Sequence, residues 1–179
     1  FQLNLHMDGA RFANAVVASG VNPADITWRA GVDCLSFGLT KNGGIATEAV
    51  VMFNQALAED FAYRRKRAGH LWSKQRFLAA QWLALLESDL WLDNARHANA
   101  MARELAVGFA AHDAIRLPWP VDANELFPVI PGVLRGRLRD AGLVFYDWPQ
   151  EADMTRFVTH FGTDPAELAR AVEVIATCQ

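Results

Sequence analysis

The chain has little cysteine, no excess of basic residues and no long apolar run, and each absence excludes a class of protein. Cys34 and Cys178 lie far apart and match no metal-ligand spacing, so we expect no metal site and a reduced, cytoplasmic protein. The 17 Lys and Arg against 20 Asp and Glu give a net charge of -3, which argues against nucleic acid as a partner. No segment approaches the roughly 20 apolar residues that cross a bilayer, so we expect no membrane partner.

The composition is that of a globular protein. Of the 179 residues, 52% are hydrophobic and 21% are charged, which suits one medium domain or two small ones. Residues 1–7 (FQLNLHM) alternate apolar and polar side chains, as a half-buried strand does. Because a natural domain rarely opens inside a strand, we expect that the sequence is a fragment with further chain upstream.

The first part of the chain predicts an α/β layer, in which apolar strands alternate with helices and turns. The expected elements, in order, are a strand at 1–7, a helix over about 10–19 closed by Gly20, a short helix over 22–31, a strand at 32–39, a turn at 40–44 and a strand at 46–53.

The rest of the chain is first helical and then mixed. Apolar side chains recur at helical spacing from residue 54 to about residue 110, and Pro118-Trp119-Pro120 marks a boundary. The elements expected beyond it are a strand near 125–130, a helix over 131–141, strands at 143–146 and 154–161, and a last helix that Asp164-Pro165 cap and that reaches Thr177.

Two polar residues at strand ends give the first indication of chemistry. Lys41 directly follows an apolar strand, and a lysine there is costly unless it is bonded to something, for instance covalently to a cofactor. Asp8 likewise ends a strand, at the edge where α/β sheets bind ligands. Pyridoxal phosphate requires such a pair, a lysine for attachment and an acid beside its ring nitrogen. Each residue alone is also typical of a surface turn or a helix cap.

Four segments carry motifs that occur together in one enzyme family. They are residues 5–15 (LHMDGARFANA), 32–43 (VDCLSFGLTKNG), 65–77 (RKRAGHLWSKQRF) and 155–161 (TRFVTHF). In this order they resemble the threonine aldolases, a fold-type-I family that depends on pyridoxal 5'-phosphate. The second segment has Thr-Lys-Asn where Ser-Lys-Gly is commoner. The third departs from the usual glycine-rich Arg-Gln segment and looks like the phenylserine aldolase branch.

The resemblance implies a role for each matching residue. Lys41 would attach the cofactor covalently, and Asp8 would pair with its pyridine nitrogen. Arg11 and Arg156 would hold the substrate carboxylate, a task that suits the guanidinium fork. Lys74 would reach toward a cofactor site, which could be that of a neighbouring subunit. The phosphate-binding glycine turn and the ring-stacking histidine, which the family's first half supplies, have no counterpart here.

The resemblance also implies a fold and a reaction. The chain is similar to the C-terminal part of a fold-type-I α/β enzyme: residues 1–70 would end the cofactor-binding large domain, 71–112 would be connecting helices, and 113–179 a small α+β domain. The complete protein would be a homodimer or homotetramer that cleaves a β-hydroxy-α-amino acid, of threonine or phenylserine type, to glycine and an aldehyde. Two alternatives stay open: another fold-type-I activity, such as a transaminase or β-eliminating lyase, and a catalytically incompetent chain that persists as a folded or oligomeric module.

Overall fold

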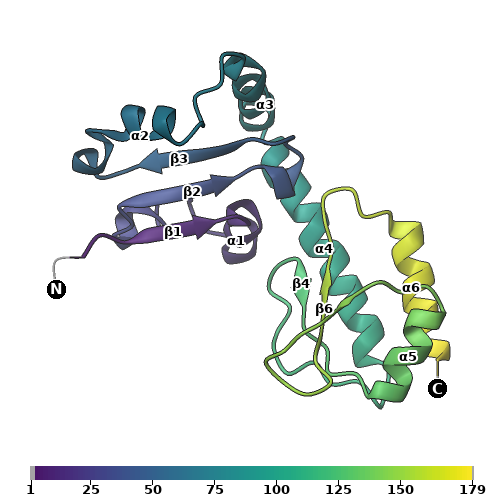
Figure 1. Cartoon of the computed structure of the whole chain (residues 1–179). Coiled ribbons are helices and arrows are strands. Elements are labelled where there is room, and N and C mark those ends of the chain that lie inside the picture. Colours follow the sequence, from purple (N-terminus) through teal and green to yellow (C-terminus); the bar gives the residue numbers. More distant parts are fainter. Residues whose placement is uncertain (1–2, 179) are drawn as a thin grey trace. The chain divides into compact units, whose positions relative to one another are not determined.

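The computed structural model describes residues 3–178 and divides the chain into two compact units, one ending at Asn94 and one beginning at Ala95. Figure 1 shows the long helix α4 (Leu90–Ala110), which contains the point of division. Each unit has its own three-stranded sheet and is described by itself. The finer division into residues 1–70, 71–112 and 113–179 stays a prediction. Residues 1 and 2 of the first predicted strand lie outside the described residues.

The sheet of the first unit has the strand order β1-β2-β3. β1 (His6–Gly9) and β2 (Cys34–Gly38) run parallel, and β3 (Glu48–Met52) pairs antiparallel with β2. A parallel pair requires a crossover, and here the crossover contains α1 (Phe12–Ser19). The predicted α/β layer is therefore confirmed, although each strand is shorter than the apolar run that indicated it.

Helix α1 ends where the sequence predicts, but the short helix after it does not form. Gly20 has φ of 65°, the left-handed conformation that glycine adopts readily after a helix. The helix expected over 22–31 is reduced to one 3-10 turn, η1 (Trp28–Ala30), so that prediction is wrong in extent. Thr27, with φ of -122° and ψ of -110°, lies outside the helical region and interrupts the stretch before η1.

The predicted helical stretch from residue 54 to about residue 110 is confirmed and is divided into shorter helices. They are η3 (Gln55–Ala58), α2 (Phe61–Arg67), α3 (Gln75–Glu87) and α4. Gly69 and Asp89 have φ of 79° and 56°, and such left-handed residues interrupt a right-handed helix. No helix within residues 3–178 is both long and apolar enough to cross a membrane.

An aromatic cluster packs the helices of the first unit against its sheet. The ring of Phe37, on β2, makes edge-to-face contacts with Phe12 of α1, Trp82 of α3 and Trp91 of α4, at centroid distances of 5.2, 4.8 and 5.5 Å. Each such contact stabilises by about 0.5–1.5 kcal/mol beyond the burial of its area. Three helices are thereby held against β2, the strand that leads to Lys41.

The second unit is an α+β unit around an antiparallel sheet with the strand order β4-β6-β5. The strands are β4 (Glu125–Leu126), β5 (Tyr146–Asp147) and β6 (Thr155–Val158), and the helices beside α4 are α5 (Gly132–Asp140) and α6 (Pro165–Thr177). The predicted elements are present with shorter strands, and the strand predicted at 143–146 is shifted, because β5 shares only Tyr146 with it. The cap predicted at Asp164 is confirmed, because its carboxylate accepts the N–H of Ala166 at 2.8 Å.

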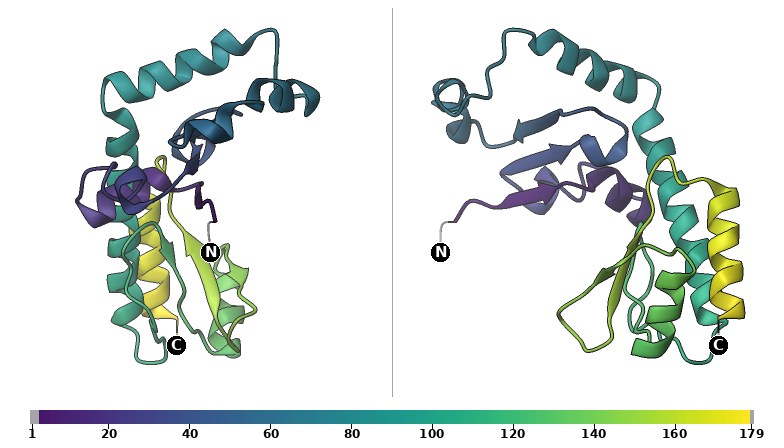
Figure 2. Two further views of the ribbon diagram at one scale, coloured as in Figure 1. Left: turned by 90° about the vertical axis from the view of Figure 1, so that its left-hand side faces the viewer. Right: turned by 45° about the vertical axis from the view of Figure 1, so that its right-hand side comes forward.

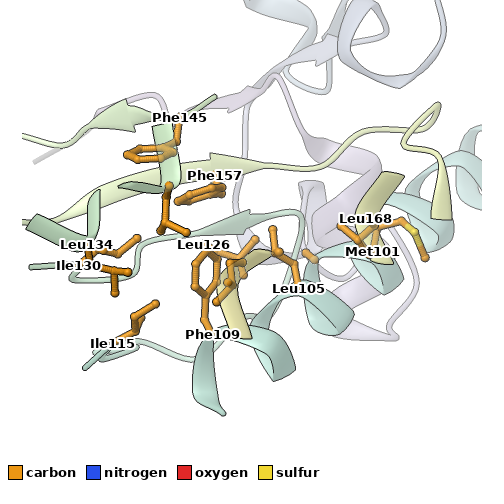
Figure 3. Close-up of a cluster of buried hydrophobic side chains, with 13 residues drawn as sticks. Met101, Leu105, Phe109, Ile115, Leu126, Ile130, Leu134, Phe145, Phe157 and Leu168 are labelled. Carbon is orange, nitrogen blue, oxygen red and sulfur yellow. The ribbon is translucent and has the colours of Figure 1, made fainter. Parts of the chain in front are cut away.

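The core of the second unit lies between its helices and its sheet. Figures 1 and 2 show α4 and α6 side by side, and Gly108 permits this approach, because a Cβ there would lie 3.0 Å from the side chain of Val172. Figure 3 shows the buried side chains that meet there. Phe157 of β6 packs edge-to-face on Phe109 and stacks on Phe145, at centroid distances of 4.9 and 4.7 Å. This packing holds β6, the strand that carries Arg156.

Candidate active site

The ends of the two parallel strands carry both residues of the predicted lysine–acid pair. Asp8 is the third residue of β1, and Lys41 lies three residues beyond the end of β2. Parallel strands present their carboxyl ends at the same edge of a sheet. A Cβ on Gly38 would lie 2.8 Å from the Cα of Ala10, so glycine permits the segments that follow the two strands to approach closely. The structure therefore brings the segments of Asp8 and Lys41 together.

One face of this parallel pair is polar. His6 and Asp8 are two residues apart on β1 and so share a face. Ser36 of β2 lies opposite Asp8 in the strand register, and its Oγ lies 2.8 Å from the Nε2 of His6. The carboxylate of Asp8 is exposed on this face, and its Oδ1 accepts the N–H of Ala10 at 3.0 Å. The Asp8 side chain is therefore oriented by the backbone that turns into α1.

Lys41 is the middle residue of a short 3-10 turn, η2 (Thr40–Asn42), and its side chain is exposed. The turn follows Leu39, whose side chain is fully buried. Glu48, the first residue of β3, accepts two backbone N–H groups with its two carboxylate oxygens: that of Leu39 at 3.0 Å and that of Thr40 at 3.3 Å. Charge-assisted bonds of this kind are stronger than bonds between neutral groups. The backbone on the N-terminal side of Lys41 is thus held by a side chain of the next strand.

Asn42 holds the other side of the lysine turn. Its side chain is 4% exposed, and its Nδ2 donates to the carbonyl oxygen of Trp91 at 2.7 Å. Its own carbonyl oxygen accepts the Nδ2 of Asn94 at 2.9 Å. Gly43 then reverses the chain with φ of 109°, which favours glycine. Lys41 is therefore an exposed amine between two anchored neighbours.

Arg11 and Arg156 belong to different units, and each is described within its own. Arg11 is partly buried and directly precedes α1. Arg156 on β6 forms an ion pair with Glu125 of β4, and its guanidinium lies 5.2 Å from the ring centroid of Trp148. The Nε of Arg156 is buried without a hydrogen-bond partner among residues 3–178, so the guanidinium retains one unused donor. The convergence of the two arginines on a substrate carboxylate stays a prediction.

Lys74 is exposed and directly precedes α3. Within the described part of the chain, no hydrogen bond or ion pair joins its amine to Asp8 or Lys41. The resemblance gives Lys74 a role toward a cofactor site that could belong to a neighbouring subunit. Cofactor binding by Lys74 therefore stays a prediction.

The cysteines and possible metal ligands do not form a site in the described residues. No group of three or more His, Cys, Asp or Glu side chains within residues 3–178 could hold a metal ion, and neither Cys34 nor Cys178 forms a disulfide. Burial raises the pKa of the Cys34 thiol above its ordinary value, because apolar surroundings disfavour the thiolate. Cys34 is thereby held in its less reactive form.

Sequence reasoning did not find the residues that hold the lysine turn. Glu48 is a single acid at the start of an apolar strand, and the chain between it and Thr40 gives no sign that its carboxylate folds back. Asn42 is bonded to Trp91 and Asn94, which lie 49 and 52 positions further along the chain. The one local signal is the pair Gly43-Gly44, which predicts a tight reversal that returns β3 to the lysine.

Known proteins resemble the chain in sequence over nearly all of it. Residues 2–130 match the protein-family model described as beta-eliminating lyase. A low specificity L-threonine aldolase of Pseudomonas aeruginosa is 47% identical over 176 residues, and one of a Pseudomonas species is 45% identical over 176 residues. Each alignment covers 97% of this chain and 51% of the relative. The chain thus spans about half the length of the curated relatives it matches.

Solved structures resemble the chain in fold. The threonine aldolase of Leishmania major matches with a TM-score of 0.86 at 32% identity, over 97% of this chain and 51% of that one. A structure from Listeria monocytogenes matches with a TM-score of 0.70 at 20% identity, over 99% of this chain and 52% of that one, and at that identity the likeness concerns the fold alone. The predicted fold class is confirmed over about half the length of these structures.

Proposed function

The chain belongs to the beta-eliminating lyase family, and from this membership we propose that the complete protein cleaves β-hydroxy-α-amino acids to glycine and an aldehyde. Pyridoxal 5'-phosphate is the cofactor of this family and of the threonine aldolases that the chain resembles. The observation that carries the proposal is the pair of strand ends at one sheet edge, one with an exposed carboxylate and one with an exposed amine. Relatives at 45–47% identity that are threonine aldolases support the reaction.

The residues at this edge fit the cofactor. Covalent attachment requires an accessible amine, and the Lys41 side chain is exposed on a turn whose neighbours are anchored. The ring nitrogen requires a fixed acid, and Asp8 is exposed with its carboxylate oriented by the N–H of Ala10. Gly38 permits the two segments to lie close together. Lys41 and Asp8 would therefore hold the cofactor.

The chain's own residues have distinct tasks in the proposed reaction. When bound, pyridoxal phosphate withdraws the electrons that the cleaved Cα–Cβ bond leaves behind. The Asp8 carboxylate keeps a proton on the ring nitrogen by charge pairing. The resemblance gives Arg11 and Arg156 the task of binding the substrate carboxylate, which suits the guanidinium fork. Lys41 would hold the cofactor through its side-chain amine.

Three finer statements belong to the same proposal. The phenylserine-like segment at residues 65–77 supports a substrate with an aromatic side chain. Homo-oligomer formation is supported by exposed apolar side chains near the start of α3, where Trp72 is 50% and Phe77 54% exposed. A reduced, cytoplasmic setting is supported by two cysteines without a disulfide.

The test uses the full-length protein that contains this chain. Borohydride reduction followed by peptide mapping should place the cofactor on Lys41, and Lys41→Ala should abolish visible absorbance and turnover. Lys66→Ala, in the exposed segment of α2, is the matched control and should retain both. Product analysis with a β-hydroxy-α-amino acid should give glycine and an aldehyde. A keto acid with ammonia would indicate β-elimination, an amino-group exchange would indicate a transaminase, and an adduct on Lys66 or Lys74 would refute the assignment of Lys41.

A further inference from the structure

We propose that Glu48 is a positioning residue for Lys41, which it places by binding the backbone on the N-terminal side of the lysine. The inference rests on the proposed function, because it takes Lys41 as the residue that attaches the cofactor. It assigns to Glu48 a role in the rate of that attachment and none in contacting substrate or cofactor.

The geometry around Glu48 supports a positioning role. Its Oε2 accepts the N–H of Leu39 at 3.0 Å and its Oε1 accepts the N–H of Thr40 at 3.3 Å. Both oxygens are therefore engaged by consecutive backbone amides, and the second amide belongs to the residue before Lys41. Glu48 itself is held in place by the strand register, in which it pairs with Gly38.

The opposite side of the turn is fixed independently, so the role of Glu48 can be separated from that of the fold. Asn42 bonds Trp91 and Asn94, and Ile45 donates its N–H to the Oε1 of Gln81 at 2.6 Å. These contacts join the turn to α3 and α4, and none of them involves Glu48. Loss of Glu48 therefore leaves the Leu39 and Thr40 amides without this acceptor, while the contacts of Asn42 and Ile45 do not involve it.

Holding a reacting group in one place accelerates a reaction because its orientation is settled before the reactants meet. The Lys41 side chain has four rotatable bonds beyond its Cα, and movement of the backbone adds to that freedom. A carboxylate with two oxygens can accept from two amides, whereas the amide side chain of glutamine offers one acceptor oxygen. The proposal therefore predicts a graded series, Glu48 above Glu48→Gln above Glu48→Ala.

The experiment measures three properties of the full-length protein and of each variant. The first is the rate at which visible absorbance appears when pyridoxal phosphate is added to cofactor-free protein. The second is hydrogen exchange of the Leu39 and Thr40 amides without cofactor, and the third is the melting temperature. Glu87→Gln, at an exposed glutamate at the end of α3, is the matched control.

We expect Glu48→Gln to attach the cofactor about tenfold more slowly than the wild type, and Glu48→Ala more slowly still. One of the two amides should lose protection in the Gln variant and both in the Ala variant. Glu87→Gln should leave the rate and the exchange unchanged. If Glu48→Ala does not fold, the rate and exchange of Glu48→Gln against Glu87→Gln decide the question.

Wild-type attachment rate and amide exchange in Glu48→Gln would overturn the proposal. Equal slowing in the Gln and Ala variants would also overturn it, since charge and not two acceptor oxygens would then be responsible. A lower melting temperature with an unchanged rate would show a purely structural role. A wild-type adduct on a lysine other than Lys41 is a separate result, because it refutes the proposed function itself.

Discussion

Asn94 and Asn42 are joined across 52 residues, because the side-chain amide of Asn94 donates to the backbone carbonyl of Asn42 at 2.9 Å. Asn42 directly follows Lys41, and its side chain bonds Trp91, three residues before Asn94. The first turns of α4 therefore hold the C-terminal side of the lysine turn. Substitutions in this part of α4 should therefore alter the position of Lys41, although these residues lie far from the lysine in sequence.

Asn42→Ala should destabilise the full-length protein by roughly 1–3 kcal/mol, because it removes a buried donor and leaves the carbonyl of Trp91 without that partner. Urea denaturation measures the free energy of unfolding. Asn22→Ala is the control, since Asn22 is exposed and its side chain also bonds the backbone, in this case by accepting the N–H of Ala24. A loss no larger than that of the control would contradict the anchoring role of Asn42.

Gly44→Ala should destabilise by about 1–3 kcal/mol, because the added Cβ would lie 2.7 Å from the buried side chain of Leu39 and force the packed turn apart. Gly136→Ala, in the middle of α5, meets no atom within 4 Å. That variant should instead stabilise by about 0.5–1 kcal/mol, since alanine favours a helix more than glycine does. Thermal and urea denaturation should show that the free energy of unfolding falls for Gly44→Ala and rises for Gly136→Ala. Changes of the same sign in both variants would contradict this packing.

Arg156→Lys should raise the KM for the amino-acid substrate by about 10-fold to 100-fold, corresponding to loss of a charge-assisted bond of about 1.5–3 kcal/mol. Affinity for the cofactor should change little, because Arg156 is assigned to the substrate carboxylate. The control is Arg137→Lys, on the exposed part of α5. Equal losses of substrate and cofactor affinity would argue for a structural role through the Glu125 ion pair.

Cys34 should react with iodoacetamide at pH 8 more slowly in the native protein than in the denatured chain. Burial raises its pKa, so fewer thiolates are present at this pH. The same shift makes stability depend on pH. Because the folded state favours the neutral thiol, the stability that Cys34 contributes is complete below the ordinary pKa of a thiol and is lost as pH rises through the raised pKa of Cys34. Mass spectrometry of the alkylated Cys34 peptide measures the rate. Equal rates in the native and denatured protein would contradict the effect of burial.

The placement of a carboxylate and an amine at strand ends was predictable from the sequence because it depends on local order along the chain. Asp8 stands before Gly9 and a helix, and Lys41 stands between an apolar strand and two glycines. Strand and helix periodicity determines which segments alternate, so the α/β layer and the cap at Asp164 could be inferred from neighbouring residues alone. The helix expected over 22–31 did not form because the backbone of Thr27 leaves the helical region.

The contacts that hold these residues in place were decided only by the tertiary structure. His6 bonds Ser36 across 30 residues, and Asn42 bonds Trp91 across 49. Such pairs depend on strand register and on where a later helix packs, and neither can be inferred from the spacing of residues in the sequence. The sequence by itself therefore determined which residues carry the amine and the acid. Only the packing of α4 and the return of β3 determined that the amine stands on an anchored turn, because both anchors come from segments that fold back from further along the chain.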